Sequence, residues 1–357
     1  MISVRSLTAR HGTFAIHDVS FDVPPSAYGM IIGPAGSGKT TTLETMAGLI
    51  PAVSGTVLFG GRDVTALPPE ERRLAIVYQN AYLFPHLNVR DNVHYGARDP
   101  AAADDLAGRF GVAPFGSRDV RTLSGGERQL VAIVRALSSR PEVLLLDEPF
   151  AALDPRARAG ARRALRAVHA EHRFTVLHVT HDFDEAGSVG DVAVLMEAGH
   201  VVQAGPPADV FRRPATAHAA SFLGAENIFA GTARRLGDRS PDWSAGTASS
   251  VDEHAVAFSV GSLTMHAIGD ALPGPATAVI RAEEIAISRE PRASSIRNQF
   301  GGRVSEIVPS GAITRVTVDV SGIPIVAALT TRSVDELHLA IGSDVVVAFK
   351  ATAVHLC

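Results

Sequence analysis

Eight residues from Gly33 to Thr40, GPAGSGKT, restrict the possible fold more than any other stretch of this chain. They fit the pattern G-x-x-x-x-G-K-[ST], follow the apolar run YGMII and precede the helix-compatible segment TTLETMAGL. A glycine-rich loop between a strand and a helix lets backbone N–H groups surround phosphate oxygens, and the helix N-terminus adds a favourable dipole. Lys39 is placed to reach the β- and γ-phosphates, and the Thr40 hydroxyl to ligate Mg²⁺. The alternative is a glycine-rich turn that matches the pattern by chance.

Composition limits the class of protein. The chain has 357 residues, 46% of them hydrophobic and 20% charged, which indicates a globular protein of two or more domains. A net charge of −4 argues against broad nucleic-acid binding through a basic face. The single cysteine, Cys357, permits no disulfide within the chain. No apolar run approaches the roughly 20 residues of a membrane span, and MISVRSLTARHG lacks a signal-peptide core, so any role at a membrane is expected to depend on partners.

The chain divides into two regions of different pattern. Residues 1–225 alternate short apolar runs with helical patterns, which predicts an α/β domain with a buried, mostly parallel sheet. Residues 226–357 carry short β-like runs with turn signals, and 297–357 resemble one small barrel. One helix is expected there, in SVDELHLAIG, with Ser333 as N-cap, Glu336 at the third position and Gly342 as its C-terminal stop.

Two acids follow the apolar segment Val143–Leu146. Placing the carboxylates of Asp147 and Glu148 at the end of a buried strand costs free energy, which indicates that they have a function there. Asp147 suits Mg²⁺, through water, and Glu148 suits polarising an attacking water. A solvated strand end is the alternative.

The stretch TLSGGERQ, residues 122–129, combines a helix start with two glycines. Ser124 and Glu127 are spaced as a capping box, so a helix is predicted to begin here, with Leu130, Val134 and Leu137 towards the core. Glycine disfavours helix, so an ordinary capped helix does not account for Gly125 and Gly126.

Six motifs occur in one order: the phosphate loop, VYQN with Gln79, LSGGE, LLLDEP, ALDP with Asp154, and VTHD with His181. In this order they resemble the ATP-binding cassette family. The resemblance implies contacts to ATP from Gly33, Pro34, Ala35, Gly36, Ser37, Gly38, Lys39, Thr40 and Thr41. It implies that Ser124, Gly125, Gly126, Glu127 and Asp154 reach the ATP held by a second copy of the chain. It further implies catalysis by Glu148, His181 and Gln79, with Mg²⁺ near Thr40, Gln79 and Asp147.

The motifs leave some positions open. The serine usual in the family's S-A-L-D loop is Ala151 here, which removes one interface hydrogen bond. The aromatic residue that stacks on adenine is expected in ARHGTFAIHDV, at His11 or, as the other candidate, at Phe14. The segment NAYLFPHLNV after Gln79 is expected near a membrane permease or, alternatively, as a buried aromatic loop.

The end of the chain resembles a molybdate-binding small barrel of the Mop or TOBE type, in RNQFGGRVSEI, ALTTRSVDELHL and VVAFKATAV. Candidate oxyanion ligands are Arg297, Thr330, Ser333 and Lys350. The alternative is a barrel that only dimerises the chains and supports regulation.

Together these resemblances imply the ATP-hydrolysing subunit of a molybdate or tungstate importer. Its expected partners are a second copy, two integral membrane permeases at the cytoplasmic face of the membrane and, indirectly, an external solute-binding protein, with no nucleic acid. The same role for sulfate, ferric iron, polyamine or phosphonate is the nearest alternative. A soluble non-transport ATPase and an anion-sensing regulatory protein are alternatives of other classes.

Overall fold

The computed structural model describes residues 1–182, 190–236, 254–269 and 273–357, and these fall into two compact units. The units are Met1–Val210 and Phe211–Cys357. Residues 211–225 pack with the second unit, where Arg281 donates to the carbonyls of Phe211 and Leu223. The compact units thus divide after Val210, whereas the sequence pattern changes after residue 225. The predicted domain boundary at residue 225 stays a prediction. In the described parts of the chain, no helix combines the length and apolar character that crossing a bilayer needs.

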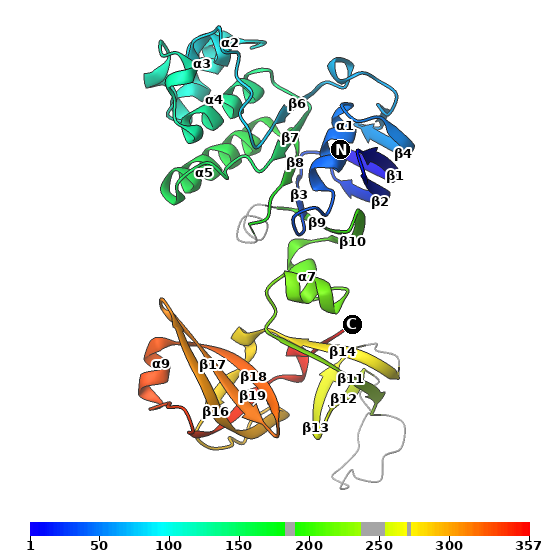
Figure 1. Ribbon diagram of the computed structural model, residues 1–357, viewed down its shortest axis with the longest axis vertical. Coiled ribbons are helices and arrows are strands. Elements are labelled where there is room, and N and C mark those ends of the chain that lie inside the picture. The colour runs from blue at the N-terminus through cyan, green and yellow to red at the C-terminus, as the bar shows by residue number, and fades with distance from the viewer. Residues whose placement is uncertain (183–189, 237–253, 270–272) are drawn as a thin grey trace. The chain divides into compact units, whose positions relative to one another are not determined.

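The first unit is built on a six-stranded sheet in the order β10-β9-β3-β8-β7-β6 (Figure 1). Neighbours from β9 to β6 run parallel, and β10 is antiparallel to β9. The strands β3, β7 and β8 are buried throughout, which is why they read as unbroken apolar runs. The predicted α/β fold is thus confirmed. The strands are β3 (Tyr28–Ile32), β6 (Leu74–Val77), β7 (Val143–Asp147), β8 (Thr175–Val179), β9 (Val192–Glu197) and β10 (His200–Gly205).

A second, antiparallel sheet has the order β2-β1-β4-β5 and shares a core with the first sheet. Helix α1 (Lys39–Ala47) contributes Leu43 and Met46 to that core. Apolar residues alternate along the second sheet because only one of its faces is buried. Its strands are β1 (Ile2–His11), β2 (Phe14–Val23), β4 (Ala52–Phe59) and β5 (Arg62–Asp63).

Three helices gather beyond β6: α2 (Val89–His94), α3 (Pro100–Arg109) and α4 (Gly125–Ser138) (Figure 1). The capping box that starts α4 is confirmed, since Glu127 N donates to Ser124 Oγ at 3.2 Å and Ser124 N donates to Glu127 Oε2 at 2.7 Å. Helix α5 (Pro155–His172) begins with Asp154 as N-cap. Helices α7 (Pro207–Arg212) and α8 (Ala217–Phe222) follow β10, and 3₁₀ turns lie at Pro69–Glu71, Ala113–Phe115 and Val120–Thr122.

The second unit holds two five-stranded sheets, β13-β12-β11-β14-β20 and β15-β19-β16-β17-β18, which enclose one apolar core. Two buried asparagines join the sheets. Asn227 on β11 bonds both backbone groups of Val326 on β18, and Asn298 on β16 does the same for His266 on β13. The predicted β-rich barrel architecture is confirmed. Its strands are β11 (Asn227–Arg235), β12 (Ala255–Val260), β13 (Leu263–Ile268), β14 (Gly274–Ile280), β15 (Ala286–Ser288), β16 (Asn298–Ser310), β17 (Ile313–Val320), β18 (Ile323–Thr330), β19 (Asp344–Phe349) and β20 (His355–Leu356), with 3₁₀ turns at Ala282–Glu284 and Ala351–Ala353.

The helix predicted in SVDELHLAIG is displaced towards the N-terminus. Helix α9 spans Thr331–Glu336, and its N-cap is Thr330, whose hydroxyl accepts from Ser333 N at 3.1 Å. The predicted N-cap Ser333 was therefore wrong, because the threonine that ends β18 reaches the free N–H first. Gly342 belongs to a later turn, where its N–H donates to the Val304 carbonyl.

Candidate nucleotide site

Four segments with predicted roles lie at one edge of the parallel sheet. Strands β3, β8, β7 and β6 are neighbours and run parallel, so their carboxyl ends meet at the same edge. The phosphate loop follows β3, His181 follows β8, and Gln79 follows β6. Asp147 ends β7, and Glu148 comes directly after it. Thr40 and Asp147, which are 107 positions apart in sequence, are thereby brought into contact.

The phosphate loop borders a pocket of about 310 Å³. Gly33 cannot carry a side chain, because a Cβ there would lie 2.1 Å from the Met196 carbonyl oxygen. Gly38, with φ of 101°, caps α1 and passes so close to Ile16 that a Cβ would lie 2.7 Å from its Cγ2. The glycines therefore let the loop pack on β2 and β9 while its N–H groups stay near the pocket. The pocket is lined by His11, Phe14, Ala35, Gly36, Gly38, Lys39, Thr40, Thr41 and Glu148.

Lys39 is held inside this loop by its own backbone. Its Nζ donates to the carbonyls of Gly33 and Pro34, each at 2.8 Å, and the residue is 8% exposed. Burial lowers the pKa of Lys39, against the opposite effect of Glu148 and Asp147. Ser37 Oγ is also buried and has no hydrogen-bond partner among the described residues. A buried ammonium and an unpaired hydroxyl in a phosphate-binding loop fit an anionic ligand.

Thr40 and Asp147, two of the three residues predicted to lie near Mg²⁺, are hydrogen-bonded to each other. Thr40 Oγ1 donates to Asp147 Oδ2 at 3.0 Å, and Asp147 is 5% exposed. Burial raises the pKa of Asp147, and the Glu148 and Glu44 carboxylates add to that, while Thr40 and Lys39 oppose it. One carboxylate and one hydroxyl suit Mg²⁺, which prefers oxygen ligands and completes its shell with water and substrate phosphates.

Glu148 and His181 are in direct contact. His181 Nδ1 lies 2.9 Å from Glu148 Oε1, and Glu148 N donates to the Val179 carbonyl at 2.9 Å. The Glu148 backbone has φ of 45°, an uncommon value for a side chain of this size. Such strain persists where the surroundings fix it, and it often marks a functional site. The Glu148 side chain is 19% exposed and that of His181 67%, so the pair borders solvent on the histidine side.

Gln79 is exposed just beyond β6, and its neighbour Tyr78 is anchored by Gln129 of α4, whose Nε2 donates to the Tyr78 carbonyl at 2.8 Å. Sequence reasoning did not identify Gln129, which is 1% exposed and links α4 to this loop.

Of the two residues predicted to stack on adenine, His11 has a side chain that is 66% exposed, whereas Phe14 packs against the apolar core. Both line the loop pocket, and the ring of His11 is the more exposed of the two.

The glycines of LSGGE have different surroundings. A Cβ on Gly126 would lie 3.0 Å from Leu153 Cδ2 and 3.1 Å from the Ala152 carbonyl, so packing within the chain already restricts this position. A Cβ on Gly125 would meet only Ala152 Cβ, at 3.9 Å. The expectation that structure within the chain does not account for these glycines was therefore wrong for Gly126, which this packing explains. For Gly125 it stays a prediction. Asp154 also has a local use, since its carboxylate caps α5 by accepting from Arg156 N and Ala157 N.

In the second unit, the structure groups only two of the four candidate oxyanion ligands. Arg297 and Lys350 line one pocket of about 170 Å³. The hydroxyls of Thr330 and Ser333 lie 2.7 Å apart at the start of α9 and do not line it. Sequence reasoning missed His266, which comes from β13; the full lining is Leu236, Ala255, His266, Ala267, Ile268, Ser295, Arg297, Lys350, Ala351 and Thr352. Burial and the nearby Arg297 lower the pKa of His266, and its Nδ1 is buried with no partner among the described residues.

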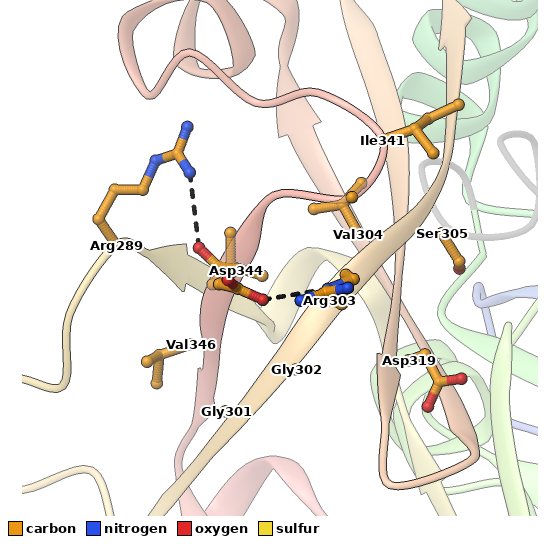
Figure 2. Close-up of a pocket in the computed structure, with 12 residues that line it drawn as sticks. Arg289, Gly301, Gly302, Arg303, Val304, Ser305, Asp319, Ile341, Asp344 and Val346 are labelled. Carbon is orange, nitrogen blue, oxygen red and sulfur yellow. Dashed lines mark hydrogen bonds and ion pairs between the residues drawn. The ribbon is translucent and has the colours of Figure 1, made fainter.

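A larger hollow of about 760 Å³ lies over β16 and β19, and Figure 2 shows its side chains. Its polar groups are already used. Arg303 pairs with Asp344 at 3.1 Å, Arg289 donates to the Leu337 carbonyl at 2.9 Å, and Asp319 accepts from Gly322 N. Because each of these charged side chains already has a protein partner, this hollow offers less to a charged ligand than the smaller pocket beside Lys350.

Comparison with known proteins agrees with this geometry. Residues 16–151 match the family model for ABC transporters, and residues 294–356 match the TOBE domain. A molybdate/tungstate import ATP-binding protein of Pyrococcus horikoshii is 38% identical over 100% of this chain and 99% of its own length. An iron(III) import ATP-binding protein of Rhizobium meliloti is 36% identical over 99% of this chain and 96% of its own.

A solved structure supports the assignment. It is a dimeric ATP-binding cassette in a post-hydrolysis state with ADP and phosphate, with a TM-score of 0.53 and 26% identity over 58% of this chain and 99% of that one. The glycine-rich loop, the Thr40–Asp147 pair and the Glu148–His181 pair thus meet at a sheet edge in a chain that resembles import ATPases from end to end. The chain belongs to the ATP-binding cassette transporter family and is an ATP-hydrolysing subunit of the import type.

Proposed function

We propose that this subunit drives the uptake of molybdate or tungstate, by hydrolysing ATP at the carboxyl edge of its parallel sheet. The observation that carries the cargo is the likeness to a molybdate/tungstate import ATP-binding protein over the whole chain, including the barrel. The observation that carries the reaction is the Thr40–Asp147 pair beside the Glu148–His181 pair.

ATP would enter with its phosphates in the loop of residues 33–40 and its base against His11. Lys39 would exchange its two backbone carbonyl partners for oxygens of the β- and γ-phosphates. Thr40, Asp147 and Gln79 would hold Mg²⁺, which neutralises charge on the phosphates. Glu148 would polarise the attacking water, and His181 would orient Glu148 and contact the γ-phosphate. The protein supplies positioning and charge, as phosphoryl transfer requires.

A second copy of the chain would complete each site. The start of α4, with Ser124, Gly125, Gly126 and Glu127, would face the γ-phosphate bound by the partner, and Asp154 would lie beside it. The backbone N–H groups and the dipole of α4 favour an anion there. Glu127 already accepts from Ser124 N, so its carboxylate organises the helix start while the glycine N–H groups meet the phosphate.

The segment after Gln79 suits a permease contact. Tyr82 is 66% and Tyr95 56% exposed, while Phe84 lies between Tyr95, at 4.2 Å between ring centroids, and the Arg135 guanidinium, at 5.0 Å. An aromatic surface of this kind suits a protein partner. We place the subunit at the cytoplasmic face of the membrane through two permeases, with an external protein delivering the anion and no nucleic acid involved.

The barrel would bind the anion when its concentration in the cytoplasm is high. Two cations, Arg297 and Lys350, with the hydroxyls of Ser295 and Thr352 and the imidazole of His266, offer charge and donors to a tetrahedral oxyanion. Bound anion would damp hydrolysis in the assembled transporter. Ferric iron is the second candidate cargo, supported by the Rhizobium relative, but a pocket with two cationic side chains suits an anion better.

Two measurements test the proposal. Glu148→Gln should abolish turnover while ATP still binds and a closed dimer accumulates; turnover at the wild-type rate would overturn the catalytic assignment. Calorimetric titration of the full chain with molybdate, tungstate and sulfate should show binding of the first two. If sulfate binds equally well or no anion binds, the barrel does not select the cargo, and ATP hydrolysis in the presence of the permeases then decides the transport role.

A further inference from the structure

Arg158 connects the loop that follows β7 with the loop that follows β8. It stands in the first turn of α5, where its Nη2 donates to the Leu153 carbonyl at 3.3 Å. Its Nη1 lies 3.6 Å from Asp182 Oδ2. Leu153 immediately precedes Asp154, and Asp182 immediately follows His181.

The surroundings hold Arg158 in place. Its side chain is 30% exposed and lines a pocket of about 80 Å³ together with Glu148, Phe150, Ala151, Thr180, His181 and Asp182. Leu153 is 6% exposed and anchored by its N–H to the Phe150 carbonyl at 3.1 Å. A planar guanidinium can bond two groups at fixed angles, so Arg158 fixes the loop 150–154 relative to residue 182.

The Nε of Arg158 differs from the two terminal nitrogens. It is buried and has no hydrogen-bond partner among the described residues. The same pocket contains Ala151, where the family's loop ordinarily has a serine. Ala151 has no hydroxyl that could bond to a neighbouring loop. Arg158 connects the loop 150–154 to the segment of His181 and Asp182 without using residue 151.

We propose that Arg158 is a positioning residue for ATP hydrolysis, and that it couples the Asp154 loop to the Glu148–His181 pair. The path is continuous in the structure: Leu153 to Arg158, Arg158 to Asp182, and His181 to Glu148 at 2.9 Å. Arg158 touches no reacting atom in this path. A displacement of the Asp154 loop, which a second copy would cause on closing, would reach His181 through the guanidinium and change how Glu148 is aimed at water.

The test separates positioning from folding and from nucleotide binding. In Arg158→Gln, kcat for ATP should fall by roughly 10- to 100-fold, because a misaimed base costs that much, while KM for ATP stays within about threefold. Arg158→Lys should have a kcat between those of Arg158→Gln and the wild type. Lysine keeps the positive charge that faces Asp182, but it cannot also bond the Leu153 carbonyl in the same geometry. Arg156→Gln, an exposed arginine of the same turn, is the matched control and should hydrolyse ATP as the wild type does.

A second variant guards against misfolding of the first. Asp182→Asn breaks the same path at its other end without changing α5, and should lower kcat in the same manner. The double variant should be no slower than Arg158→Gln alone, because both changes cut one path. Wild-type kcat in a folded Arg158→Gln, a loss confined to KM, or fully additive effects of the two substitutions would overturn the proposal.

Discussion

The phosphate site of the first unit and the cationic pocket of the second unit are assembled in different ways. In the first, polar groups come from short motifs that end neighbouring parallel strands, and they already bond one another: Lys39 to its loop, Thr40 to Asp147, His181 to Glu148. In the second, Arg297 and Lys350 are exposed, and His266 Nδ1 is buried with no partner among the described residues. A parallel sheet collects local motifs at one edge, whereas a barrel of two antiparallel sheets forms its pocket only when the sheets pack together.

The difference predicts how strongly each site depends on single residues. Lys39 and Asp147 are nearly buried, so their interactions act at low effective dielectric and are worth more than those of surface charges. The cations of the barrel pocket are screened by water, so each should contribute less. Predictions follow from this contrast, from the largest effect to the smallest.

Removing the buried ammonium should have the largest effect. Lys39→Ala should lower ATP hydrolysis by at least about 100-fold, because the γ-phosphate loses its nearest cation. Molybdate binding to the barrel should be retained in this variant, as measured by calorimetry on the full chain. If a folded Lys39→Ala protein loses both ATP hydrolysis and molybdate binding, the two sites do not function independently.

Removing both cations of the barrel pocket should have a smaller effect. Arg297→Gln with Lys350→Gln should weaken molybdate binding by roughly 10- to 100-fold, the equivalent of one or two charge-assisted hydrogen bonds. Arg332→Gln is the matched control, since Arg332 is 86% exposed and pairs with Glu336 on α9, away from the pocket. Equal weakening by the control would show that general charge, and not this pocket, attracts the anion.

The same contrast explains how much could be predicted from sequence. The parallel sheet, the loop between β3 and α1 and the capping box of α4 follow from local patterns, and the structure shows each of them. The meeting of Thr40 with Asp147, which are 107 positions apart, was implied by the family resemblance and not by local spacing. The grouping of Arg297 with Lys350 also matched one pocket. His266 was missed because the Asn298 side chain at the start of β16 binds the His266 backbone on β13, a contact between distant segments that no local pattern encodes. Gly126 was misinterpreted for the same reason, as its close neighbours lie in the loop before α5.

Acid should destabilise the first unit through His178, a buried residue of β8. Burial, followed by the effect of Arg162, lowers the pKa of His178 to about 3, against about 6.5 for an unfolded histidine. Between these values the unfolded chain binds a proton that the folded chain does not, so stability is full above pH 6.5 and is lost as pH falls. The expected slope is about 1.4 kcal/mol per pH unit.

Hydrogen exchange at the amides of β3 and β8, compared at about pH 7 and pH 5, measures this slope. His178→Gln keeps a partner for the Tyr28 hydroxyl, which lies 2.9 Å from His178 Nδ1, and removes the titration. The variant should therefore lose less stability than the wild type on acidification. An equal loss in both would assign the acid sensitivity of this unit to other groups.

The smallest expected effect concerns Thr330, which sequence reasoning placed among the oxyanion ligands. In the structure its hydroxyl caps α9 by accepting from Ser333 N, and it does not line the cationic pocket. Thr330→Ala should therefore cost about 1 kcal/mol of stability, the usual value for losing an N-cap, and leave the affinity for molybdate unchanged. Thr330→Ser is the control and should restore the stability, because serine caps as well as threonine does. Chemical denaturation and calorimetry on the same samples distinguish the two roles: a loss of anion affinity without a loss of stability would place the anion at α9 and would contradict the assignment of the pocket around Arg297 and Lys350.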